Sequence, residues 1–218
     1  GGSDVAENTS HRYRTAGALV MMPIALATED ELSEAIGLRL IAENSAWMTN
    51  EPMLLRRDGF GYLKSGMKKW LELARQQPVL LLTDLDRKPC PEGLRQEWLA
   101  GARIQAGLLF RVAVREIESW VLADHMAFRK LIGSKGRLPE APDELAEPKQ
   151  HLLQLAQHAP REVRLDLIRT EGRQIRQGLG YNRRLVQWVH AEWSPVRAAE
   201  RSPSLARARR ALAGCATG

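Results

Sequence analysis

The spacing of apolar residues predicts alternating strands and helices over the first 133 residues. Nearly continuous apolar runs at 17–27, 78–86 and 107–114 are typical of strands that are buried on both faces. Helical spacing follows each run, in segments at 28–44, 67–77, 93–105 and 115–133. This alternation predicts an α/β fold with an open, mostly parallel sheet flanked by helices.

Two connections carry more specific signals. Thr28 is followed three residues later by Glu31, which predicts a capping box at the start of the first helix. Residues 50–66 contain three glycines and no clear periodicity, so we expect a loop there.

The pattern changes after Gly133. A segment with three prolines is followed by stretches of helical spacing at 151–159, 161–177, 183–193 and 203–213, and no strand is predicted among them. We therefore expect a tag-like, disordered N-terminus at 1–16, an α/β domain at 17–133, and a basic helical extension at 134–218 packed on that domain. The helical spacing of three tryptophans favours core positions over base stacking, namely Trp120, Trp188 and Trp193.

Charge is distributed unevenly along the chain, which has a formal net charge of +6. Residues 1–124 carry 15 basic and 17 acidic side chains, a net charge of −2, whereas residues 125–218 carry 17 and 9, a net charge of +8. This asymmetry indicates either a polyanionic partner such as nucleic acid or an arginine-rich soluble surface. Two cysteines do not suffice for a disulfide framework or a zinc quartet, and no apolar run is long enough to span a membrane. We expect a cytoplasmic protein with no membrane partner.

Acidic residues follow each of the three predicted strands. They are Glu29 after the first, Asp84 and Asp86 at the end of the second, and Glu116 and Glu118 after the third. In a parallel sheet these positions share one edge, where ligands usually bind. If Asp84 and Asp86 lie in an extended segment, both project from one face. Carboxylates at this spacing are suitable ligands for Mg²⁺ or Mn²⁺. Alternatively, the glutamates start helices and the aspartates are turn residues.

Basic residues near these acids are candidates for contacts with phosphate. They comprise a group in and after the glycine-rich loop, one lysine in the proline-rich segment and a pair before a late helix: Arg56, Arg57, Lys64, Lys68, Lys69, Lys149, Arg183 and Arg184. All could instead be solvated surface residues. The loop sequence GFGYLKSG lacks the Gly-Lys-Ser/Thr of a phosphate-binding P-loop, which argues against a nucleoside triphosphatase.

Glu29 after one strand and Asp84-x-Asp86 after another resemble the motifs of the TOPRIM fold, found in topoisomerases, primases and overcoming-lysogenization-defect-type nucleases. REIESWVLAD at 115–124 is similar to a Glu-x-Glu…Asp segment of an uncharacterised bacterial TOPRIM-like family. PDELAEPKQHL at 142–152 and GLGYNRRL at 178–185 look like later motifs of that group. The sequence departs from the TOPRIM pattern in having Asp30, not glycine, after the glutamate.

The resemblance covers most of residues 18–212 and implies a metal-dependent nuclease. It implies that Asp84 and Asp86 bind Mg²⁺, that Glu29 is a general acid/base or a metal ligand, and that Glu116 and Glu118 complete the acidic site. Lys149 lies in a resembling segment, where it could neutralise charge on a phosphoryl group. The family further implies an antiphage-defence setting beside an ATPase. The alternatives are a non-catalytic partner subunit of an ATPase, or a module that only binds nucleic acid.

Overall fold

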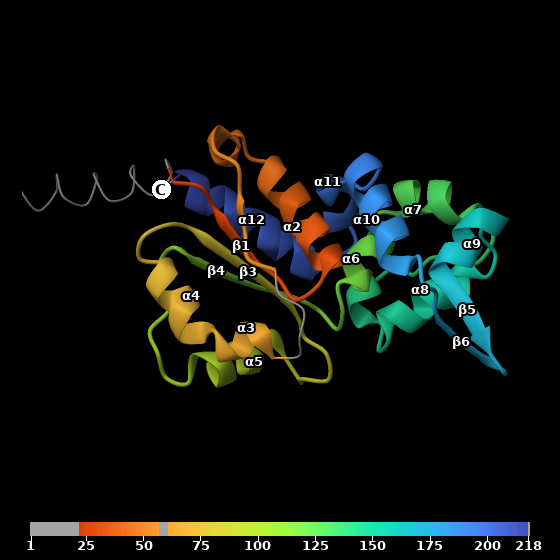
Figure 1. The fold of residues 1–218 in the computed structure, drawn as a ribbon, viewed down its shortest axis with the longest axis horizontal. Coiled ribbons are helices and arrows are strands. Elements are labelled where there is room, and N and C mark those ends of the chain that lie inside the picture. The colour runs from red at the N-terminus through yellow and green to blue at the C-terminus, as the bar shows by residue number, and fades with distance from the viewer. Residues whose placement is uncertain (1–21, 57–60, 218) are drawn as a thin grey trace, which may run out of the picture.

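The computed structural model describes residues 22–56 and 61–217 and contains a four-stranded sheet that is parallel throughout (Figure 1). The strands are β1 (Ala25–Ala27), β2 (Met53–Leu54), β3 (Val79–Asp84) and β4 (Leu108–Ala113), in the order β2-β1-β3-β4. Pairing of β3 with β4 runs in register from Val79↔Leu108 to Asp84↔Ala113. The expected parallel α/β architecture is confirmed. The expected first strand began at residue 17, and its portion up to residue 21 lies outside the described residues.

Strands β1, β3 and β4 are largely apolar because both faces of the sheet are covered there, whereas β2 is exposed. Leu80 and Leu82 of β3 pack into one core cluster, whereas Val79 and Leu81 pack into another on the opposite face. One face is covered by α4 (Met67–Leu73) and α5 (Pro91–Leu99). The other is covered by α2 (Glu31–Ala42) and α12 (Pro203–Thr217), and α6 (Glu118–Ala123) joins the same core cluster.

The first connections differ from expectation in three respects. Helix α2 is capped by Asp30, whose Oδ1 atom accepts the Ser33 N–H at 2.7 Å, so the predicted capping box at Thr28 is wrong. A short helical turn, η1 (Ser45–Thr49), follows α2. The expected loop at 50–66 contains β2 and the short helix α3 (Tyr62–Ser65). Strand β2 was missed because it is only two residues long and exposed.

The expected helix at 115–133 is divided into α6 and α7 (His125–Ile132) by the buried residue Asp124. Its carboxylate caps α7 by accepting the Ala127 N–H at 3.2 Å. It also accepts the Arg197 guanidinium through two bonds of 2.9 and 2.8 Å. This buried, fully paired carboxylate fixes the end of α6, whose first residue belongs to the candidate site.

The C-terminal part contains a hairpin that the sequence pattern did not predict. The helices of this C-terminal part are η2 (Pro142–Glu144), α8 (Pro148–Ala156), α9 (Arg161–Leu167), α10 (Tyr181–Ala191), α11 (Pro195–Ala199) and α12. Between α9 and α10, β5 (Ile168–Glu171) and β6 (Gln174–Gln177) pair in antiparallel register. The expected helix at 161–177 is therefore wrong beyond residue 167. Gly172 explains the reversal, because its φ of +61° favours a tight turn over a helix.

The C-terminal helices share one core with the sheet. Helix α10 packs on α2 and α12 packs on β4 (Figure 1). The expected burial of Trp120, Trp188 and Trp193 is confirmed, since none exposes more than 5% of its surface. The Trp120 indole donates to Ser204 Oγ at 2.7 Å, and the Trp193 indole donates to the Trp120 carbonyl at 3.0 Å. Among the described residues, no helix has the length and apolar character needed to cross a membrane.

Candidate functional site

The carboxyl ends of β1, β3 and β4 bring the predicted acids to one edge of the sheet. Asp84 is the last residue of β3, and the charges of Glu118, Asp30 and Asp86 all act on it. Burial is the largest cause that raises the pKa of Asp84 well above its usual value, and these neighbouring acids raise it further. The parallel topology thus produces the predicted acidic cluster.

Asp84 holds a carboxylate oxygen that nothing in the described part of the chain satisfies. Its Oδ1 atom is inaccessible to solvent and accepts no hydrogen bond. A buried anionic oxygen without a donor is costly, because the lost hydration is not replaced. Such an oxygen is a natural site for a proton or a cation.

Asp86 does not extend β3 as predicted. It is exposed and has a φ of +51°, so the assumption of one extended segment with both aspartates on one face is wrong. The Asp86 N–H donates to the Arg115 carbonyl at 2.8 Å. The Arg115 guanidinium donates to the carbonyls of Asp86 and Lys88. Arg115 also has a left-handed backbone, with a φ of +63°. Two left-handed non-glycine residues on adjacent loops are strained, and such strain is concentrated at functional sites.

Glu118 is the most buried acid of the cluster, with 1% of its surface exposed at the start of α6. Its Oε1 atom accepts the Tyr181 hydroxyl at 2.8 Å and lies 3.3 Å from Lys149 Nζ. Its Oε2 atom is buried with no hydrogen-bond partner in residues 22–56 and 61–217. Burial raises the pKa of Glu118, although Lys149 and Tyr181 act in the opposite direction.

Tyr181 is a site residue whose role the sequence did not reveal. It follows the Gly-Leu-Gly of the segment at 178–185 that looks like a family motif, and nothing in the sequence marks it as the partner of an acid. Its side chain is instead buried, with its hydroxyl on Glu118. Burial, followed by the charge of Glu118, raises the pKa of Tyr181 well above its usual value, so the hydroxyl remains a donor.

Lys149 joins the buried acids to the open surface. Burial acts to lower the pKa of its amine, but the charges of Glu118, Glu116 and Asp84 outweigh it, and the pKa is raised. Its backbone N–H donates to Glu116 Oε2 at 2.8 Å, which anchors the start of α8 on the loop after β4. The side chain is 42% exposed, so a fixed positive charge faces both the acids and solvent.

Glu29 lies at the end of β1, on the side of the cluster near Asp86. Burial raises the pKa of its carboxyl, backbone hydrogen bonds from Leu63 and Gly61 lower it, and the charges of Asp86 and Asp30 raise it again. The net increase makes the Glu29 carboxyl a weaker acid than an ordinary glutamate, which favours a role in proton transfer.

The predicted phosphate-binding cations are mostly paired within the protein. Arg56 contacts Glu34 at 3.3 Å, and Lys64 contacts Glu97 at 2.6 Å. Glu97 also binds Lys88 at 2.5 Å, and these two lysines lower its pKa to about 2.

The remaining cations are distributed over other surfaces. Arg183 and Arg184 pair with Asp166 at 3.0 and 2.5 Å. Lys69 stacks over the Trp70 ring, with its Nζ 4.8 Å from the centroid, and Lys68 is exposed. Arg57 lies outside the described residues. Of the predicted cations, Lys149 contacts the acidic cluster.

The donor set fits a hard divalent cation only in part. No group of three or more His, Cys, Asp or Glu side chains in the described chain is arranged to hold a metal ion without other ligands. Asp84 and Glu118 nevertheless each hold a buried carboxylate oxygen that has no donor. Mg²⁺ usually takes one or two carboxylates and completes its shell with water and substrate phosphate. The two acids therefore suit a cation that binds together with a phosphate.

An open hollow of about 320 Å³ adjoins the cluster. Glu116 and Lys149 line it at one end, and Gln150, Ile175 and Gln177 are among the residues further along. Lys149 therefore lies between the acidic cluster and this hollow.

Comparisons of the chain with protein-family models, with curated proteins and with solved structures give no match.

Proposed function

We propose that the protein hydrolyses phosphodiester bonds in nucleic acid with the help of Mg²⁺ or Mn²⁺. The proposal is carried by two buried carboxylate oxygens that accept no hydrogen bond, one on Asp84 and one on Glu118. They lie beside Lys149, which lines an open hollow. Carboxylates of this kind and a phosphate are together the ordinary ligands of Mg²⁺. The resemblance to TOPRIM nucleases supports the same function.

In this proposal Asp84 and Glu118 would hold the cation, with Asp86 and Glu116 at the rim of the site. The cation, when bound, polarises the phosphoryl group toward attack. Lys149 places its ammonium beside a non-bridging phosphate oxygen and offsets the charge that develops there. Tyr181 holds Glu118 in place through its hydroxyl.

Glu29 is suited to proton transfer because its pKa is raised. In hydrolysis, water attacks phosphorus, the bond between phosphorus and the leaving oxygen breaks, and that oxygen takes up a proton. A carboxyl with a raised pKa can accept the proton of the attacking water or donate one to the leaving oxygen. Glu29 is our candidate for one of these two roles.

The test is cleavage of single-stranded DNA, plasmid DNA and transfer RNA by the full chain, with Mg²⁺, Mn²⁺ or EDTA present. We expect cleavage that requires the metal and falls at least a hundredfold in Asp84→Asn and in Glu118→Gln. Glu72→Gln is the matched control, because it makes the same chemical change at an exposed ion pair on α4. Equal cleavage by all variants, or cleavage that persists in EDTA, would contradict the proposal.

A further inference from the structure

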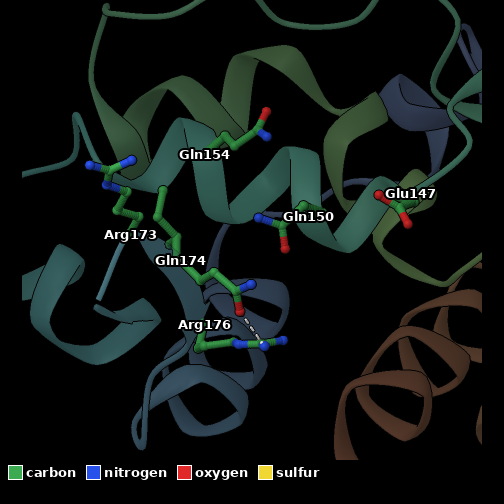
Figure 2. Close-up of a pocket in the computed structure, with 7 residues that line it drawn as sticks. Glu147, Gln150, Gln154, Arg173, Gln174 and Arg176 are labelled. Carbon is green, nitrogen blue, oxygen red and sulfur yellow. Dashed lines mark hydrogen bonds between the residues drawn. The ribbon is translucent and has the colours of Figure 1, made fainter. Parts of the chain in front are cut away.

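A second hollow continues the first, away from the acids. It has a volume of about 420 Å³ and lies between α8 and the β5–β6 hairpin (Figure 2). The two hollows share Glu147, Gln150, Ile175 and Arg176 as lining residues. They therefore form one groove, which leads from Lys149 and Glu116 to the tip of the hairpin.

The wall formed by α8 presents amide groups to this groove. Gln150 and Gln154 lie four residues apart and therefore on one side of α8. Figure 2 shows them opposite the hairpin, from which Gln174 adds a third amide. Each amide offers donors and an acceptor, so this wall can pair with groups that carry both.

The hairpin adds positive charge. Arg176 donates a hydrogen bond to the neutral amide oxygen of Gln174. The carboxylate of Glu171 lies 4.0 Å from the Arg176 guanidinium. Arg173 is exposed at the turn, and its side chain makes no hydrogen bond or ion pair within the part of the chain that the structure describes. Guanidinium groups on one side and amides on the other match a chain of phosphates with bases attached.

We propose that this groove, which we name the α8–hairpin groove, holds an unpaired nucleic acid strand and leads it to the acidic cluster. This inference rests on the proposed function, and it specifies single-stranded nucleic acid as the substrate. Three glutamines and Glu147 carry the donors and acceptors that suit base edges, and a carboxylate does not suit a phosphate backbone. Base edges with their full hydrogen-bonding capacity are accessible in single strands. Glu147 would also repel a phosphate placed beside it, which favours a base at that position.

Binding without cleavage tests the groove. Fluorescence anisotropy of the full chain in EDTA would measure the affinity for a labelled single strand of mixed sequence, as DNA and as RNA, and for the matching duplex. We expect the single strand to bind at least tenfold more tightly than the duplex. In Arg173→Gln/Arg176→Gln we expect single-strand binding to weaken about tenfold or more. The plot of log affinity against log salt should become shallower by about 1.4, since each phosphate contact of a single strand contributes about 0.7.

The matched control is Arg161→Gln/Arg164→Gln, which removes the same charge from exposed positions on α9. If single-strand binding weakens equally in both double variants, the effect comes from net charge, and the proposed role of the groove is overturned. Duplex binding as tight as single-strand binding would overturn the single-stranded assignment.

The two proposals fail separately. If single-strand binding depends on the groove but no metal-dependent cleavage is seen, the proposed nuclease activity is refuted and the proposed role of the groove stands. Suppose instead that cleavage requires Asp84, but that Arg173→Gln/Arg176→Gln changes neither the cleavage rate nor the affinity for the single strand. This result would refute the proposed role of the groove and would leave the proposed nuclease activity standing.

Discussion

Asp84→Asn should make the metal-free protein more stable, which is the opposite of the usual effect of mutating a partly buried residue. Asp84 Oδ1 is buried without a donor, and acidic neighbours surround the carboxylate. Asparagine keeps the shape of the side chain, removes the charge and adds an N–H₂ donor among carboxylates. Leaving a buried charged group unsatisfied costs about 1–3 kcal/mol or more, so we expect a gain of about 1–3 kcal/mol. For a chain of this size, that raises the melting temperature by roughly 3–10 °C.

The assay is urea and thermal unfolding in EDTA, with Asp86→Asn as the control. Asp86 is exposed, and asparagine tolerates its left-handed backbone, so the control should change stability by less than about 0.5 kcal/mol. The gain in Asp84→Asn should also depend on pH. Because the folded-state pKa of Asp84 is raised, its contribution to stability is fully present below the unfolded pKa of about 4 and is lost as pH rises through the folded value. The gain should therefore be larger at pH 8 than at pH 5.

Adding metal should reduce the difference in stability between Asp84→Asn and the wild-type protein. A cation present at ten times its dissociation constant stabilises the wild-type protein by about 1.4 kcal/mol, and the variant should lose this response. If Asp84→Asn destabilises the metal-free protein by more than about 1 kcal/mol, Asp84 has a structural partner and our interpretation of its unpaired oxygen is wrong.

Three further predictions concern the surroundings of the site. Lys149→Met should destabilise the protein by about 1–3 kcal/mol at pH 7, and by much less in a Glu118→Gln background; a double-mutant cycle with no coupling would contradict the ion pair. Tyr181→Phe removes a hydrogen bond that lowers the pKa of Glu118, so the acid limb of the cleavage pH profile should move to higher pH; an unmoved profile would exclude this role. Gly178→Ala would place a Cβ atom 2.3 Å from a backbone oxygen and should cost about 1–3 kcal/mol, whereas Gly214→Ala, in open space on α12, should stabilise by about 0.5–1 kcal/mol. Thermal unfolding of both glycine variants checks the last pair, and equal shifts would contradict it.

Three strands of the sheet, β1, β3 and β4, could be predicted from sequence because they are buried on both faces. The run PVLLL at 78–82 is apolar at every position and leads directly into Thr83 and Asp84, and few other structures accept such a run followed by an acid. The convergence of Asp84 and Glu118 could be predicted for the same reason, since parallel strands place their carboxyl ends together. Topology alone thus located the acidic cluster.

The details that depend on single residues could not be predicted. Residues 161–177 carry apolar side chains at helical spacing, yet Gly172 turns the chain into a hairpin. Asp86 follows β3 directly, but its left-handed backbone depends on bonds with Arg115 on another loop. The partnership of Tyr181 with Glu118 joins residues 63 positions apart, and no local pattern records it.

The most direct test of the account is the position of Mn²⁺, measured by anomalous diffraction from crystals of the wild-type protein soaked in the metal. We predict a peak in contact with the carboxylates of Asp84 and Glu118, and no such peak in Asp84→Asn. A wild-type protein that shows saturated Mn²⁺ sites elsewhere and none at these two carboxylates would contradict the assignment of the sheet edge as a metal centre.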